Sequence, residues 1–330
     1  MALSYDQITA TTRKHFIPKL VDNIFVSNVI TQRLLKKSVS TSGGEKIVEP
    51  LIYAKGRSGF YDSYDVLDIS PTDEITAAAY DWKFAYAAIT ISRKEELQNS
   101  GPDAVIDLLK SKMKIAEMTI KDTFGTNVFT TGATSANAFV GFYDLIEQNS
   151  SAVGGIDPSS YSWWSSNTLN VTSASNYGNS TAPDWDAIVT TTNASYVHKF
   201  MRDMYGQCTE DNIQPSLIVT TQEVYDAYEA SLTANKRFTG NQSLADAGFP
   251  NLAFRNASVV VDSHCPSGRM YFLNEDYLQF RHHKDEFFRF EGFQKPINQN
   301  VRVAKIFWAG ALTCSNRRFQ GVVTGLPTAY

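Results

Sequence analysis

The sequence of 330 residues predicts an α+β fold with two interleaved lobes. Three observations lead to this prediction. Apolar and polar residues alternate from Ile75 to Ile91, which is the period of a strand. An amphipathic segment with helical spacing follows, from Pro102 to about Phe124. Strand-like segments then return in residues 252–308, so the chain goes back to sheet after a mixed middle region.

The N-terminal segment is predicted to be an extended arm that contains one short helix. Residues 20–35 carry apolar side chains at a near-helical spacing, and Pro18 suits an early helical position. The first forty residues hold six basic and two acidic side chains, six minus two giving +4. The basic residues are Arg13, Lys14, Lys19, Arg33, Lys36 and Lys37. This pattern fits an arm that faces a polyanion or an acidic partner, and it equally fits a solvated helix face.

Residues 45–93 predict a long two-stranded hairpin with an ordered tip. The aromatic residues of the second strand recur at every other position, which places them on one face. They are Tyr80, Trp82, Phe84 and Tyr86. A two-stranded ribbon is marginal in water by itself, so this one is expected to rest on its own lobe or on a second copy.

The segment that begins at Pro102 and Asp103 predicts a helix long enough to span a domain. At about 1.5 Å of rise per residue, twenty residues extend roughly 30 Å. The region from about 132 to 183 is rich in Ser, Thr, Asn and Gly, yet Trp163 and Trp164 indicate that it is packed. Later elements are a helix from Asp184, a buried strand at 217–219, a helix introduced by a capping box of Thr220 with Glu223, and strands at 259–261 and 270–273.

Composition excludes several classes of protein. Hydrophobic residues make up 43% and charged residues 19% of the chain, which is typical of a folded protein. A net charge of −4 argues against a free-standing nucleic-acid binder. Three widely spaced cysteines argue against a disulfide framework. The N-terminus lacks the apolar core of a signal peptide and no run is long enough to span a membrane, so we expect a soluble protein made in the cytoplasm, with no membrane partner.

No motif predicts an enzyme or a cofactor. Asp262, Ser263, His264 and Cys265 include every residue type of a nucleophilic site, but adjacent side chains of a strand point to opposite faces. His282 and His283 lack zinc-finger spacing, and three aspartates at every third position, from Asp62, do not match a calcium loop. A hydrolase that uses His264 or Asp262 stays open as a minor alternative.

Four phrases, in their order along the chain, carry a resemblance to a known family. They are YDWKFAYAAITISRKEEL, GFYDLIEQNSSAVGGIDPSSYSWW, PSLIVTTQEVYDAYEASL and FRNASVVVDSHCPSGRMYFLNEDYLQF. The chain resembles the major capsid protein of tailed double-stranded-DNA bacteriophages, with the Hong Kong 97-type capsid fold. The resemblance covers nearly the whole chain.

The resemblance implies a division of the chain. Residues 1–44 would be the N-terminal arm, 45–93 the extended loop (the β-hairpin), 94–134 the peripheral domain with its long spine helix, 135–275 the axial domain, and 276–330 strands that return to the peripheral domain. The loop would lie over a neighbouring subunit, with Arg57, Phe60 and Tyr61 in contact with it, and the aromatic face of the hairpin would be buried on its own spine helix or on a neighbour. The basic arm would lie on the inner face.

The resemblance also implies a function. The chain would assemble as hexamers and pentamers into an icosahedral shell around the double-stranded DNA of the phage, without cofactor or catalysis. Its partners would be other copies of itself, a separate scaffolding protein, a portal and decoration proteins, with non-specific proximity to the packaged DNA. Its location would be the capsid of the virion, assembled in the host cytoplasm. The alternatives are a shell subunit of an encapsulating compartment and another phage ring protein.

Overall fold

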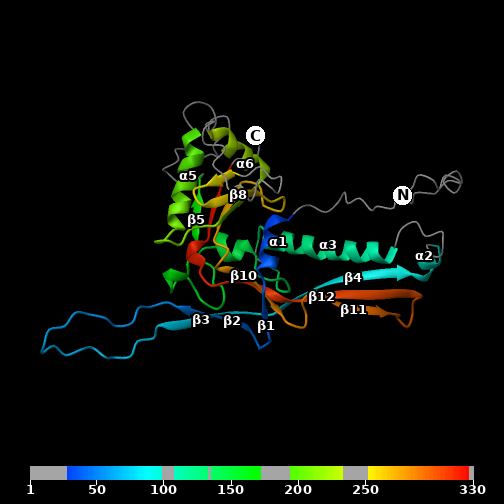
Figure 1. Cartoon of the computed structure of the whole chain (residues 1–330), viewed down its shortest axis with the longest axis horizontal. Helices are drawn as coiled ribbons and strands as arrows, with labels where there is room; N and C mark the ends of the chain where they lie inside the picture. Colours follow the sequence, from blue (N-terminus) through cyan, green and yellow to red (C-terminus); the bar gives the residue numbers. More distant parts are fainter. Residues whose placement is uncertain (1–27, 99–107, 133–134, 172–193, 233–251, 327–330) are drawn as a thin grey trace.

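The computed structural model describes residues 28–98, 108–132, 135–171, 194–232 and 252–326. These residues form a peripheral lobe around a five-stranded sheet, an axial lobe around a six-stranded sheet, and a two-stranded hairpin that projects away from both (Figure 1). The hairpin and the peripheral lobe extend to opposite ends of the long axis of the molecule. The predicted mixture of helix and sheet in two interleaved lobes is therefore confirmed.

One long strand organises the peripheral lobe. This strand, β12 (Val301–Cys314), pairs antiparallel with β4 (Lys83–Ser92) along one edge. Its other edge pairs with β11 (Arg289–Gln294) and then with β10 (Leu278–His283), and β1 (Val39–Thr41) lies parallel to β10. The lobe's helices are α1 (Val29–Lys36), α2 (Arg93–Gln98) and α3 (Leu108–Val128).

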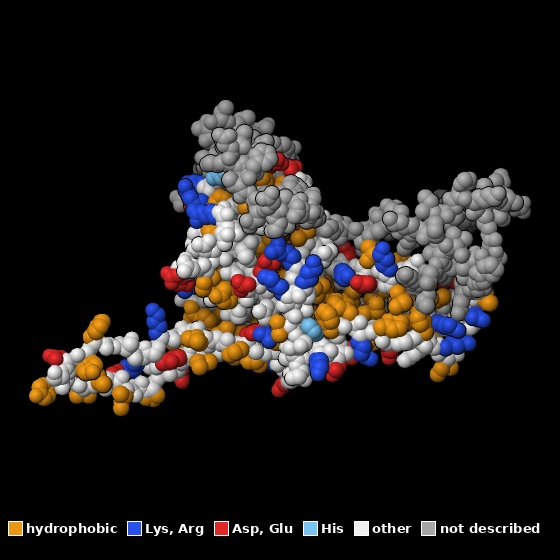
Figure 2. Space-filling model, viewed as in Figure 1, with side chains coloured by type: hydrophobic (Ala, Val, Ile, Leu, Met, Phe, Trp, Pro, Cys, Tyr) orange, Lys and Arg blue, Asp and Glu red, His pale blue; other side chains and the backbone are white. Residues whose placement is uncertain are grey.

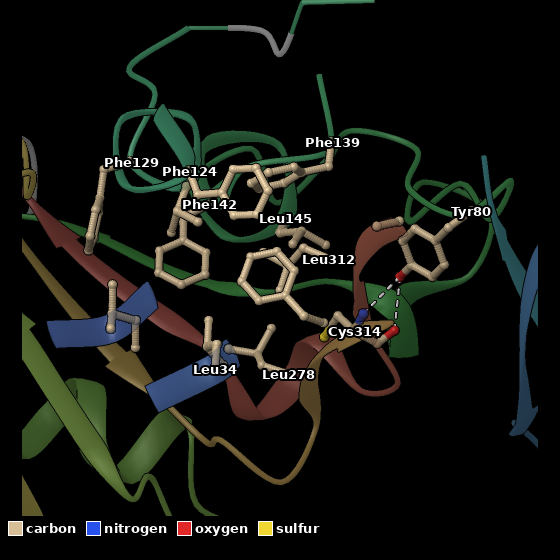
Figure 3. Packing of buried hydrophobic residues seen from close by; sticks show 14 of the residues in the cluster. Leu34, Tyr80, Phe124, Phe129, Phe139, Phe142, Leu145, Leu278, Leu312 and Cys314 are labelled. Carbon is tan, nitrogen blue, oxygen red and sulfur yellow. Dashed lines mark hydrogen bonds between the residues drawn. The ribbon is translucent and has the colours of Figure 1, made fainter. Parts of the chain in front are cut away.

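The predicted long helix is α3, which lies along the inner face of the peripheral sheet (Figure 1). Four buried residues at intervals of four, Ala116, Ile120, Phe124 and Val128, form its apolar stripe. The ring of Phe124 lies edge-on to Trp308 of β12, with the ring centroids 4.7 Å apart. Figure 3 shows this aromatic core from close by. The predicted start of the helix, at Pro102, lies outside the described residues.

The axial lobe contains a sheet in the order β5 (Asn167–Asn170), β13 (Gly321–Thr324), β9 (Arg269–Leu273), β6 (Leu217–Thr220), β8 (Ala257–Val261) and β7 (Leu252–Phe254). Helices α5 (Ala194–Gln207) and α6 (Gln222–Ser231) pack against residues of this sheet. The strands predicted at 217–219, 259–261 and 270–273 are confirmed. The predicted capping box is wrong, because Thr221 is the N-cap and Thr220 ends β6, where its Oγ1 donates to the carbonyl oxygen of Arg269.

Three short helical turns connect the lobes: η4 (Tyr143–Glu147), η5 (Ser162–Trp164) and η8 (Arg317–Phe319). Trp164 is buried and donates its Nε1 to the carbonyl oxygen of Val153, so the Ser-rich region is packed as predicted, at least up to Val171. Arg317 is completely buried and donates to backbone carbonyl oxygens at the end of η4, including those of Leu145 and Gln148. The guanidinium therefore satisfies carbonyl groups that the short helix leaves without partners.

The hairpin consists of β2 (Ile47–Ile52) and β3 (Ile75–Tyr80), paired antiparallel. The predicted single strand from Ile75 to Ile91 is wrong at Asp81 and Trp82, where the chain leaves the hairpin and continues as β4. The cause is pairing between distant segments, since β4 aligns with β12 rather than with β2. The second half of the alternating segment thus belongs to the peripheral sheet.

Candidate assembly surfaces

The loop at the end of the hairpin exposes apolar side chains to solvent. Residues 53–74 form neither helix nor strand, although one turn at Asp62–Asp65 is closed by a backbone hydrogen bond. The large apolar side chains most exposed along it are Phe60, Tyr64, Val66 and Ile69. Figure 2 shows hydrophobic side chains along both branches of the projection. Large apolar side chains that are gathered in the open on one projection typically mark an interaction site.

The three residues predicted for the hairpin tip all lie in this loop. Phe60 is fully exposed and Tyr61 is 71% exposed. Arg57 forms an ion pair with Asp68 across the loop. The loop as a whole holds two basic and five acidic residues, so its surface is apolar and acidic. A second protein surface that is apolar and basic would complement it.

The four aromatic residues predicted to share one face do not share it. Tyr80 is buried at the end of β3, and Trp82 donates its Nε1 to the carbonyl oxygen of Gly44 over 2.8 Å. Phe84 and Tyr86 lie on β4, where they are 74% and 72% exposed. The break at residues 81–82 separates the two pairs. Of these four residues, Phe84 and Tyr86 are exposed, Trp82 is half-buried and Tyr80 is buried.

Phe84 and Tyr86 lie on the outer face of the peripheral sheet, opposite to the buried residues Ala87, Ile89 and Ile91 of the same strand. Tyr86 lies directly opposite Phe307 of β12, which in turn lies opposite Arg289 of β11. Directly opposed residues of antiparallel strands share a face. The cationic groups of Arg289 and Lys305 lie 5.6 Å and 5.9 Å from the centre of the Phe307 ring. We call Phe84, Tyr86, Arg289, Lys305 and Phe307 the outer-sheet patch.

The β11 and β12 members of this patch are not among the residues predicted from the sequence. The sequence of β12 does contain a pattern that could have predicted them, because exposed or half-buried residues alternate with buried ones. This alternation places Phe307 on one face of the strand and Trp308 on the other. What the pattern could not provide is the register with β4, which brings Phe307 next to Tyr86.

The base of the hairpin is fixed to the peripheral lobe by buried polar contacts. Glu49 of β2 is only 6% exposed and accepts both branches of the Arg281 guanidinium, with Nη2 to Oε2 at 2.9 Å. Its Oε1 also accepts the hydroxyl of Thr313 at 2.9 Å. The Tyr80 hydroxyl donates to the carbonyl oxygen of Cys314 and accepts its N–H, as the dashed lines in Figure 3 show. Burial raises the pKa of Tyr80 well above its usual value, so it stays a neutral donor.

The described part of the basic arm is partly neutralised. Arg33 forms a bidentate pair with the buried Glu275, both distances being 2.8 Å, and Lys37 lies 3.7 Å from the same carboxylate. Lys36 is exposed at the end of α1. Arg13, Lys14 and Lys19 lie outside the described residues. Of the described cations of the arm, Arg33 thus stabilises the attachment of α1 to the axial lobe.

The residues of the hydrolase alternative have structural partners. Both oxygens of the buried Asp262 accept backbone N–H groups, from Ile30 and from His264. His264 lies with its Nε2 2.9 Å from an Asp122 oxygen. Burial and the Asp262 carboxylate raise the pKa of the Cys265 thiol well above its usual value, which disfavours the nucleophilic thiolate. In the described chain, no group of three or more potential metal ligands comes together, and no helix is long and apolar enough to span a membrane.

Known proteins that resemble this chain are found by structure and not by sequence. No family model and no curated protein matches this chain. The capsid of cyanophage A-1(L) superposes with a TM-score of 0.72 at 14% identity, over 96% of this chain and 98% of that chain. The chain has the Hong Kong 97-type capsid fold. The predicted fold class is therefore confirmed across nearly the full length.

Two further structures show how widely this capsid fold is shared. The capsid of a native GTA particle has a TM-score of 0.63 at 13% identity and covers 99% of this chain and 100% of that chain. The SrpI encapsulin of Synechococcus elongatus PCC 7942 has a TM-score of 0.56 at 8% identity, with 99% and 98% covered. The capsid fold thus occurs both in virus-like shells and in an encapsulin.

Proposed function

We propose that this protein is the major capsid protein of a tailed double-stranded-DNA phage, a shell subunit rather than an enzyme. The observation that carries the proposal is the apolar loop 53–74, which projects from the molecule without cover from the described part of its own chain. Burying such a surface requires another molecule. In a closed shell of identical subunits, every copy offers the loop and the surface that receives it.

The finer proposal is that the loop of one subunit lies on the outer-sheet patch of the next. The loop lies at the far end of the projecting hairpin, whereas the patch lies on the peripheral sheet where β4 leaves the base of the hairpin, so the loop of one copy can reach the sheet of its neighbour (Figure 1). The patch offers exposed rings at Phe84 and Tyr86 to the apolar residues of the loop. It also offers the cation of Lys305 to a loop with an excess of acidic residues. Arg57, Phe60 and Tyr61 would then lie in the interface, while Tyr80 would not.

The division of the chain follows from the same proposal. Residues 1–44 would be the arm, 45–93 the extended loop, 94–134 and 276–330 the peripheral domain, and 135–275 the axial domain, whose loops would surround the axes of hexamers and pentamers. We propose that the extended loop ends before β4, because β4 is part of the peripheral sheet. The loop then consists of β2, β3 and residues 53–74. A separate scaffolding protein, a portal and decoration proteins would complete the particle, which would assemble in the host cytoplasm.

Electron microscopy of the large-particle fraction after recombinant expression tests this proposal. We expect closed shells, or sheets of six-membered rings, with or without a co-expressed scaffolding protein from the same genome. A uniform small species under both conditions would contradict the proposal.

The similarity to an encapsulin supports a second candidate, a compartment that encloses cargo proteins. Nuclease treatment of particles isolated from infected or lysogenic cells separates the two. Protected DNA of uniform length indicates a capsid, and co-purified enzymes without protected DNA indicate a compartment.

A further inference from the structure

The β2–β3 hairpin has apolar side chains on both of its faces. The inner face is buried against its own chain, with Ile47, Leu51 and Tyr80 among its residues. All six positions of the other face are apolar, and they are exposed or, at one position, half-buried. Strands with apolar residues on both faces are normally covered on both faces. We call this second face the ribbon face, and it consists of Val48, Pro50 and Ile52 of β2 and Ile75, Ala77 and Ala79 of β3.

The edges of the hairpin are poorly suited to the addition of a further strand. Tyr53 donates its backbone N–H to the carbonyl oxygen of Glu74, so the alternation of an antiparallel pair turns the backbone of Pro50 away from β3. Proline has no N–H, and it blunts such an edge. On the outer edge of β3, the N–H of Ala79 donates to the carbonyl oxygen of Gly154. A partner is therefore expected to cover the face of the hairpin rather than to extend its sheet.

The ribbon face carries no charge, and this limits what can cover it. The two other exposed apolar surfaces described above do hold charged groups. The loop 53–74 has five acidic and two basic residues, and the outer-sheet patch contains Arg289 and Lys305. Burying a charged group against an apolar surface is costly. Of these three surfaces, the one that matches the ribbon face is the same face of a second copy.

The relief of the ribbon face fits a second copy in reversed orientation. At the end towards the loop, Ile52 and Ile75 lie opposite each other and are 81% and 70% exposed. At the base end, the smaller Val48 lies opposite Ala79, which also lines a hollow of about 280 Å³. A two-fold axis across the strands, at the level of Ala77, places the isoleucines of one copy over the small end of the other. An axis along the strands would instead stack isoleucine on isoleucine and hold the base ends apart.

We propose that the ribbon face is a two-fold contact between two copies of this chain, in which the hairpins pack face to face and run in opposite directions. Such isologous contacts are common between identical subunits. A stable interface has about 20–30 residues on each side, far more than the ribbon face. The contact is therefore weak in free subunits and gains occupancy where other contacts already hold the copies together. It requires a second copy of the chain, but neither the contact between loop and patch nor a shell.

Cross-linking of introduced cysteines tests the proposal on the full-length chain, both as concentrated subunit and in any particles that form. In Ala77→Cys the two thiols face each other at the two-fold axis, between sheets about 10 Å apart, so a short bismaleimide should join them. In Ile75→Cys the two thiols are also displaced along the strands by about 13 Å, which is four residues of about 3.3 Å. We expect Ile75→Cys alone to give at least about tenfold less covalent dimer. The three native cysteines are buried and should add no background.

A mixture of Ile75→Cys and Ala79→Cys chains is the matched control, because the reversed packing places these two positions opposite each other. It should give covalent dimer where Ile75→Cys alone does not. Should Ala77→Cys fail to fold, Pro50→Cys replaces it, since Pro50 lies opposite Ala77 at the same level of the hairpin.

The proposal is overturned if, in both states, Ala77→Cys or its replacement gives no more dimer than Ile75→Cys, or if the mixture gives none. A cover supplied by a different protein, or by another segment of the same chain, would produce that result. Particles that form without the cross-link would overturn the ribbon contact and leave the proposed shell function standing. Cross-linked subunits that form no particles would support the ribbon contact and contradict the shell function.

Discussion

The two ends of the β2–β3 hairpin differ in almost every physical respect. At the base, Glu49 and Tyr80 are buried and make hydrogen bonds to residues more than two hundred positions away. At the tip, Phe60 and Tyr64 are exposed and the charged contact Arg57–Asp68 is local. The base is therefore stabilised within one chain, whereas the tip gains little from its own chain. This difference supports the proposal that the tip contacts a second molecule.

The largest expected effect comes from changing the tip. Replacing both Phe60 and Tyr64 by Asp places charges where the proposed interface must exclude water, which is costly without a partner charge. We expect particle yield to fall at least about tenfold, the equivalent of roughly 1.4 kcal/mol per contact. The melting temperature of the isolated subunit should not change. Particle yield is measured by sedimentation and electron microscopy.

Ser63→Asp is the control for this tip variant, since it adds charge at a polar position of the same loop. It should assemble much better than the double variant. Equal loss in both variants would mean that the charge of the loop, and not its apolar surface, controls assembly.

The second effect is the loss of the buried ion pair at the base. In Glu49→Ala, Arg281 keeps its charge in a partly buried site without its carboxylate. Breaking a buried pair by removing one partner typically costs about 3–5 kcal/mol. We expect a loss of this size in the free energy of unfolding of the subunit, measured with urea. Glu45→Ala, at an exposed position just before β2, should change it by less than about 0.5 kcal/mol.

A smaller effect is expected from the tyrosine hydroxyl at the base. Tyr80→Phe leaves the N–H and the carbonyl oxygen of Cys314 without a partner, at a cost of about 1–2 kcal/mol. Tyr86→Phe removes the same atom from an exposed ring and should leave stability unchanged. A loss in both variants would contradict the distinction between the base and the outer sheet.

The pH dependence of this contact has a definite sign. The pKa of Tyr80 is raised in the folded state, so its contribution is complete below the ordinary tyrosine pKa of about 10 and declines as the pH rises beyond that value. We expect the stability difference between wild type and Tyr80→Phe to shrink above about pH 10. Chemical denaturation at pH 8 and pH 10.5 measures the change. A difference that grows with pH would contradict the buried neutral hydroxyl.

The smallest perturbation compares one thiol at each end of the hairpin, the native Cys314 at the base and a cysteine introduced in place of Ser63 at the tip. Burial raises the pKa of Cys314 to about 12, so at pH 8 roughly one thiol in 10,000 is ionised, and the side chain is also inaccessible. We expect Cys314 to be inert to thiol reagents until the protein unfolds, and Ser63→Cys to react at once in the free subunit. In assembled particles the thiol introduced at the tip should be protected, and equal reactivity in both states would place the tip outside the interface.

Local patterns alone determined much of the architecture. The alternation around Ile89 predicted a strand, the four-residue spacing of Ile120 and Phe124 predicted α3, and Trp164 indicated a packed loop. These signals succeed because burial on one face of an element leaves its period in the sequence. The four phrases in their order were sufficient for the capsid fold, which the structure comparison confirmed.

Only the tertiary structure decided which of these elements pair. The chain leaves the hairpin at Asp81 because β4 pairs with β12, which lies more than two hundred residues later in the sequence. This change of partner separates Tyr80 from Tyr86. The same long-range pairing buries Glu49 beside Arg281 and brings Phe307 beside Tyr86. The two-residue period of a strand shows which face of the sheet a residue occupies. It does not show which strand lies opposite. Hydrogen bonding and packing between distant segments settle that choice, because it is made when the whole sheet forms.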